Sequence, residues 1–179
     1  MIAAAELEIG RVLLERADRA QDAFDALLRA RTVIGDTPEV VQLLESMLPK
    51  GEIRVRVAEL LESIYVAQND YPKRVQILEV LAVTRSAKED RASTYERLAE
   101  VHEAHGDEGK AVDALARAAR EYPKTEAFWS HFAELARRAK KHTAFIESAT
   151  AVVPKTGATQ VPGATMLAIS GLVATMLSE

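Results

Sequence analysis

Residues 91–124 read RASTYERLAEVHEAHGDEGKAVDALARAAREYPK, and this stretch predicts two helices joined by a tight turn. In its first half, Tyr95, Leu98 and His102 recur three and four residues apart, so they share one face of a helix. The following His-Gly-Asp interrupts the pattern, because glycine suits the end of one helix and aspartate the start of the next. Small and apolar residues then recur as far as Pro123, which ends the second helix. The stretch therefore predicts an antiparallel helical hairpin.

The order of residue types along this hairpin resembles the tetratricopeptide repeat. His102 departs from the family pattern, which usually has tyrosine there, and so does Leu115, where a larger aromatic is common. The resemblance implies an all-α, right-handed α-solenoid of stacked antiparallel hairpins, whose first helices line a concave protein-binding surface. The matching positions are Tyr95, Leu98, Ala99, His102, Ala111, Leu115, Ala118 and Pro123.

The hairpin plan recurs on either side of residues 91–124. Asp70 precedes Asp107 by 37 residues and Trp129 follows Tyr95 by 34, close to the family period of 34. Residues 17–30 resemble the turn and second helix of a further copy. We predict a repeat domain over residues 1–154, followed by an apolar segment over residues 155–179. The predicted helices span residues 3–16, 19–33, 38–48, 52–68, 71–84, 88–105, 107–121, 125–140 and 142–153.

The composition excludes several classes of function. A formal net charge of -4 gives no basic face for a phosphate backbone, so we predict no nucleic-acid partner. The chain has no cysteine, which excludes disulfides and thiolate metal sites and is compatible with a cytoplasmic location. The N-terminus alternates apolar residues with Glu and Arg, as an amphipathic helix does and a signal peptide does not.

No motif in the sequence supports catalysis. His102 and His105 are three residues apart, whereas the metalloprotease helix needs two histidines four apart on one face. The sequence contains neither a phosphate-binding glycine loop nor a GxSxG motif. We therefore predict a protein that is not an enzyme and has no metal and no cofactor.

A polar face on the first helix of the best-matched hairpin is the candidate binding surface. Its members recur three or four residues apart and are Ser93, Glu96, Glu100 and Glu103. One interpretation is that they only keep the protein soluble. The other is an acidic groove for a basic or helical segment of a partner protein, in a scaffold or adaptor that catalyses nothing.

The one aromatic cluster offers a further contact residue. Trp129 and Phe132 share the predicted core face, which leaves Phe128 to the side. An exposed aromatic residue favours a partner that covers it, so Phe128 is the fifth predicted partner-binding residue. The basic run after this cluster, Arg137, Arg138, Lys140 and Lys141, is explained by the negative end of the helix dipole.

Residues 156–178 contain no charge and need a separate explanation. Three alternatives remain open: a helix that closes the end of the array, a membrane anchor, and a docking or self-association segment. Apolar residues surround most of a helix over 164–178, more than one neighbouring helix covers. We expect this helix to insert between other helices or to pack against a second copy. The alternative function is thus a structural module that forms a homo-oligomer through residues 161–178. Of the three alternatives, the membrane anchor is the one we do not expect.

Overall fold

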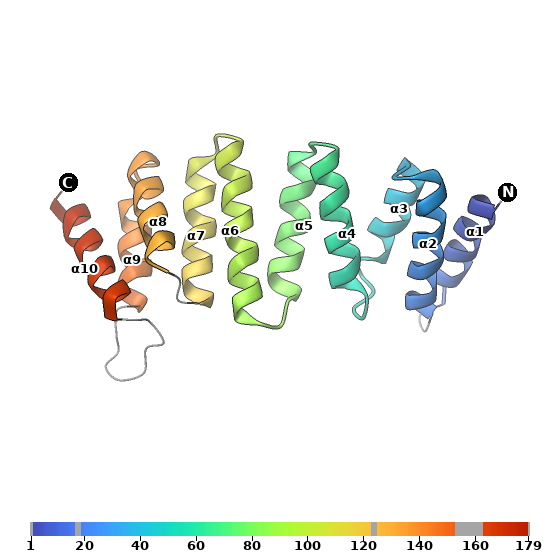
Figure 1. The fold of residues 1–179 in the computed structure, drawn as a ribbon, viewed down its shortest axis with the longest axis horizontal. Coiled ribbons are helices and arrows are strands. Elements are labelled where there is room, and N and C mark those ends of the chain that lie inside the picture. Colours follow the sequence, from blue (N-terminus) through green and yellow to red (C-terminus); the bar gives the residue numbers. More distant parts are fainter. Residues whose placement is uncertain (1, 17–18, 123–124, 153–162, 179) are drawn as a thin grey trace. The chain divides into compact units, whose positions relative to one another are not determined.

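The computed structural model describes residues 2–16, 19–122, 125–152 and 163–178, which form ten α-helices and no strand (Figure 1). They fall into two compact units, Met1–Thr84 and Arg85–Glu179. The first unit contains α1 (Ile2–Leu14), α2 (Ala20–Ile34), α3 (Pro38–Met47), α4 (Arg54–Ala67) and α5 (Tyr71–Thr84). The second contains α6 (Lys88–Ala104), α7 (Glu108–Glu121), α8 (Glu126–Arg138), α9 (His142–Val152) and α10 (Gly163–Ser178).

The prediction of an all-α fold of stacked antiparallel hairpins is confirmed within each unit. The ends of the predicted helices differ from the observed ones by at most two residues. The hairpins are α1 with α2 and α4 with α5 in the first unit, and α6 with α7 and α8 with α9 in the second (Figure 1). The right-handed path of the whole solenoid and the domain boundary at residue 154 stay predictions. Pro123 and residues 155–162 lie outside the described residues.

The turns of three hairpins repeat one backbone geometry. Asn69, Gly106 and Lys140 each take a positive φ, of 55°, 83° and 55°, directly after the first helix of a hairpin. The next amide then donates to the carbonyl five residues earlier: Asp70 to Tyr65 at 3.0 Å, Asp107 to His102 at 2.8 Å and Lys141 to Ala136 at 2.8 Å. This is the Schellman motif, which satisfies carbonyl groups at a helix end. The three turns are spaced 37 and 34 residues apart, as the sequence predicts.

The first helices of the same three hairpins bury the same register positions. Offsets of 37 and 34 residues relate the three sets, including polar members such as Glu62 and Thr94. The register therefore identifies three copies of one structural unit. The six equivalent positions are Val57, Ala58, Leu61, Glu62, Ile64 and Tyr65 in α4; Thr94, Tyr95, Leu98, Ala99, Val101 and His102 in α6; and Phe128, Trp129, Phe132, Ala133, Leu135 and Ala136 in α8.

The hairpin of α1 and α2 is a fourth, more divergent copy. Arg19 and Asp107 occupy the N-cap positions of α2 and α7, 88 residues apart, and the same offset superposes most of the buried faces of the two helices. Gly10 lies where α1 crosses α2, and a Cβ there would sit 3.4 Å from the Ala23 carbonyl oxygen. The absence of a side chain thus permits the close crossing.

Helix α3 is an insertion between the first two hairpins. Thr37 caps its first turn by accepting a hydrogen bond from the Val40 amide at 3.4 Å. Glu45 then ties it to the next hairpin, accepting from Tyr65 Oη at 2.6 Å and from Lys73 Nζ at 2.8 Å. Burial, followed by the adjacent Glu45 carboxylate, raises the pKa of Tyr65. The phenol therefore stays protonated and keeps donating.

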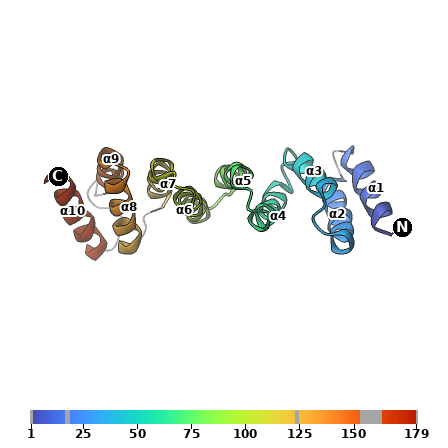
Figure 2. The same ribbon diagram turned by 90° about the horizontal axis from the view of Figure 1, so that it is seen from above.

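Helix α10 packs beside both α8 and α9 (Figure 2). It buries one stripe, Thr165, Ile169 and Met176, while Leu167 is 78% exposed and Leu177 is 69% exposed. The expectation that this helix inserts between other helices is wrong, because only one of its sides is covered. Packing against a second copy stays a prediction. Among the described helices, none is long and apolar enough to cross a membrane.

The left-handed turn residues predict opposite effects of glycine and alanine. Lys140→Gly should raise the free energy of unfolding and Gly106→Ala should lower it, each by about 1 kcal/mol, because a Cβ is strained at positive φ. Chemical denaturation measures both changes. Gly51→Ala, at a glycine without positive φ or near neighbours, is the control. Equal effects of the two alanine substitutions would contradict the role of the turn.

A larger side chain at Ala99 should strain the crossing of α6 with its neighbours. Ala99 is fully buried at one of the six shared positions, so Ala99→Leu should lower the free energy of unfolding by roughly 1–3 kcal/mol. Ala104→Leu, on an exposed position of the same helix, is the matched control. Unchanged melting of the Ala99→Leu protein would show that the site has spare room.

Candidate protein-binding surface

Helix α6 carries the four polar residues that the sequence predicts as a binding face. Ser93 and Glu100 are exposed, and Glu96 and Glu103 are partly buried. None belongs to the six shared core positions, so the register leaves them on the surface of the hairpin. The structure thus brings the four residues onto one helix, but they differ in how much of each side chain faces solvent.

Glu103 joins α6 to the next hairpin. Its Oε1 accepts from Arg138 Nη2 at 2.7 Å, and its Oε2 lies 3.0 Å from His131 Nε2, both on α8. Burial raises the pKa of Glu103, but the hydrogen bonds from Arg138 and His131 outweigh it and hold the pKa below its usual range. Glu103 is therefore a charged structural link, and its charge is already balanced within the chain.

The basic run at the end of α8 fastens the last hairpin to α6 and α7. Arg138 Nε also donates to Glu108 at 2.9 Å. Lys141 Nζ lies 2.7 Å from both carboxylate oxygens of Asp113 and donates to the Gly109 carbonyl at 2.9 Å. The helix dipole, which the sequence suggested as the reason for these charges, is thus accompanied by specific ion pairs between hairpins. The repeat register was the available signal, because the positions equivalent to Lys141 in the hairpins of α4 and α6 carry Asp70 and Asp107.

Phe128 lies in the core. The expectation of an exposed aromatic residue is wrong, because its side chain is only 7% exposed and packs edge-on against Trp129, with ring centroids 5.4 Å apart. Phe128 occupies the register position of Val57 and Thr94, which are buried in their own hairpins. A prediction from one helical stripe missed it, since a first helix in this array buries a wider face. Phe128 offers a partner little surface.

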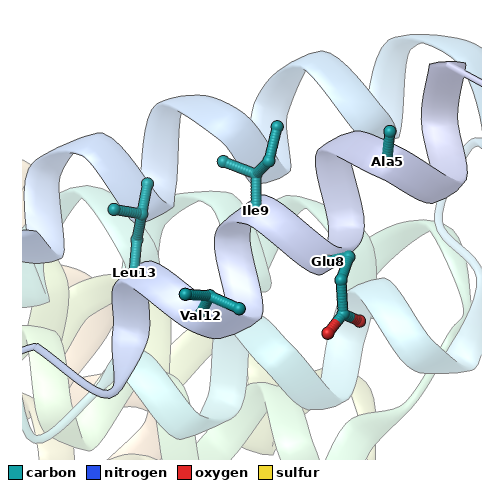
Figure 3. Close-up of a pocket in the computed structure, with 5 residues that line it drawn as sticks. All are labelled: Ala5, Glu8, Ile9, Val12 and Leu13. Atoms are coloured by element: carbon teal, nitrogen blue, oxygen red, sulfur yellow. The ribbon is translucent and has the colours of Figure 1, made fainter.

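A second surface feature lies on α1. Ala5, Glu8, Ile9, Val12 and Leu13 line a shallow apolar hollow of about 410 Å³ (Figure 3). Figure 3 shows two rows, with Ala5, Ile9 and Leu13 on one side of the helix and Glu8 and Val12 on the other. The predictions from the sequence did not include this hollow. The sequence feature that could have predicted it is a second apolar row on α1, which lies outside the buried stripe of Ala3, Leu7 and Gly10.

Within the described ranges, the structure places no group of three or more His, Asp or Glu side chains that could hold a metal ion. His102 is buried at a shared core position and His105 is exposed in the turn that follows α6. Among the described residues, the polar surface of α6 and the apolar hollow of α1 are two features that suit contact with another molecule.

Comparison with known proteins adds little to the description of the fold. No family model matches the chain, and no curated protein matches it. The chain is similar to a solved structure from the functional characterization of pilF of Pseudomonas aeruginosa. The similarity covers 98% of this chain and 88% of that one, at 12% sequence identity and a TM-score of 0.43. The assignment of the fold therefore rests on the hairpins and their register.

The ion pair between Glu103 and Arg138 predicts a pH-dependent contribution to stability. The folded-state pKa of Glu103 is depressed, so the contribution is present above the ordinary value of 4.5 and disappears as the pH falls through the folded-state pKa. As the pH falls below 4.5, the wild type should therefore progressively lose its stability advantage over Glu103→Gln. Thermal melts from neutral to acidic pH measure this difference.

The matched control for that prediction is Glu100→Gln, an exposed carboxylate three residues earlier on the same helix. Its stability difference from the wild type should change less with pH. At neutral pH a double-mutant cycle between Glu103→Gln and Arg138→Met should give a coupling of roughly 0.2–1 kcal/mol. A coupling of zero would show that the pair does not hold the hairpins together.

Proposed function

We propose that the chain binds a segment of another protein along the adjacent faces of α6 and α8, without catalysing a reaction. One observation carries the proposal: the shared register keeps one row of each first helix out of the core. The rows are Ser93, Arg97 and Glu100 on α6 and Ala127, His131 and Glu134 on α8. The resemblance to the tetratricopeptide repeat supports this choice, because that family uses the same helices to bind proteins.

The contacts of Glu103 support a preformed surface. They join α6 to α8 at Arg138 and His131, so the two rows lie on helices that are held together. Rigid presentation of contact residues favours binding, since less conformational freedom is lost when the partner arrives. Such a surface suits an extended or helical segment that crosses both helices.

The charges on these faces favour a partner with basic residues. Glu96, Glu100 and Glu134 contribute carboxylates, whereas Arg97 makes the surface less acidic than the sequence prediction implies. Glu103 adds little, because its charge is paired. We therefore retain Ser93, Glu96 and Glu100 as proposed contacts, with Glu103 as a residue that positions them.

A second candidate function is self-assembly through α10. The observation that favours it is the exposure of Leu167 and Leu177 on a helix without charge. Exposed apolar patches mark protein interaction sites when they are contiguous. A structural module of this kind would associate with its own copies rather than with a different protein.

If partners bind the polar surface of α6, lysine substitutions on that surface should abolish their binding. Quantitative affinity purification would compare the wild type with Ser93→Lys/Glu100→Lys, and with Ser86→Lys/Glu89→Lys as a control of equal charge change at exposed positions. Partners should be lost with the first variant and retained with the second. Partners retained by both variants would place the binding site elsewhere.

Partner affinity should also fall as the salt concentration rises, because contacts between exposed charges are screened within about 10 Å at 0.1 M ionic strength. Titration of an enriched partner at low and high salt measures the effect. An unchanged dissociation constant would contradict a charge-based contact on α6.

A further inference from the structure

The apolar hollow on α1 departs from the polar pattern of the first helices α6 and α8. At the 88-residue offset that relates the two hairpins, Ile9 and Val12 of α1 correspond to Arg97 and Glu100 of α6. Ile9 is 45% exposed and Val12 is 48% exposed, whereas their counterparts in α6 are charged. The apolar residues of α1 therefore occupy positions that α6 and α8 fill with polar or charged side chains. Such a patch indicates an interaction site.

The open side of α10 carries small side chains where α1 carries branched apolar ones. Between Leu167 and Leu177 it presents the small residues Ser170, Gly171 and Ala174. No side chain lies within 4 Å of a Cβ built at Gly171, so that part of the helix surface is open. Small residues let another helix approach closely, as Gly10 does where α1 crosses α2.

We infer that the open side of α10 of one copy docks into the apolar hollow on α1 of a second copy. This inference rests on the second candidate function, self-assembly through α10, and names the surface that receives it. Two properties select this pairing over the alternatives. The branched side chains of Ile9 and Val12 fit against the small residues of α10, whereas α10 against α10 places small residues opposite small ones.

The second property is charge. The hollow has one carboxylate, Glu8, which is paired with Arg11 at 3.2 Å, and Arg11 also bonds Glu39 at 2.6 Å. These pairs satisfy the carboxylate within its own copy, so the occupant need not supply a charge. Helix α10 carries none. Pairing of α1 with α1 would instead bring two Glu8–Arg11 ion pairs to one apolar contact, where both would lose water.

The contact joins two different surfaces, so each copy keeps one surface of each kind available for a further copy. Association of this type adds copies in sequence unless the array closes into a ring. A contact made by one pair of helices is smaller than the usual specific interface, which buries about 1,200–2,000 Å². We therefore expect weak association that increases with protein concentration.

Two blocked variants of the full chain test the pairing. Ile9→Lys blocks the hollow and Leu167→Lys blocks α10, and the two lysines cannot form an ion pair with each other. Val83→Lys, at a side chain that is 69% exposed on α5, is the matched control. Melting curves first establish that all four proteins fold, and sedimentation equilibrium over a wide concentration range then gives their masses.

The expected result is a mass that rises with concentration for the wild type and the control, and a monomer mass for each blocked variant alone. An equal mixture of the two blocked variants should reach twice the monomer mass and stop, because each supplies the surface that the other retains. A wild type that stays monomeric at every concentration overturns both this inference and the self-assembly candidate. Blocking by Leu167→Lys but not by Ile9→Lys overturns the inference and leaves self-assembly through α10 standing. Blocking by Ile9→Lys but not by Leu167→Lys overturns the pairing in favour of α1 with α1.

Discussion

Burial of the first helix of each hairpin over a wide arc is the constraint on which the structure depends. The six shared positions cover about 160° of the helix circumference at 100° per residue, more than one neighbouring helix covers. Each fully buried large side chain contributes about 1.5–3 kcal/mol, so a single hairpin would forgo much of that energy. Hairpins of this kind are therefore stable only when neighbours complete the core.

The same constraint explains which sequence predictions hold. Helix ends follow local signals such as Pro38 at the start of α3 and Gly106 after α6, and these signals are visible in the sequence. The hairpin plan follows from the 34- and 37-residue spacing. Burial of Phe128 does not, because it depends on a neighbouring helix whose position a single helical stripe does not reveal. The ion pairs of Arg138 and Lys141 were missed for the same reason, since their partners lie about 30 residues away on other helices.

The functional proposals follow from where the repeat pattern is kept and where it changes. In α6 and α8 the row outside the core is largely polar. A polar row suits a binding surface that is exposed to solvent when no partner is bound. In α1 the corresponding row contains Ile9 and Val12, and α10 leaves Leu167 and Leu177 exposed. Helices α6 and α8 thus present different chemistry from helices α1 and α10. This difference supports separate roles in partner binding and self-association.

The shared register is the central claim, and thiol labelling tests it most directly because the chain has no cysteine. Single cysteines at Arg56, Ser93 and Ala127 occupy one exposed register position in three hairpins, and cysteines at Ala58, Ala99 and Ala133 occupy buried ones. The shared register predicts rapid labelling of the first three proteins and strong protection of the other three under native conditions. Protection at Ala127 or rapid labelling at Ala133 in a folded protein would contradict the register.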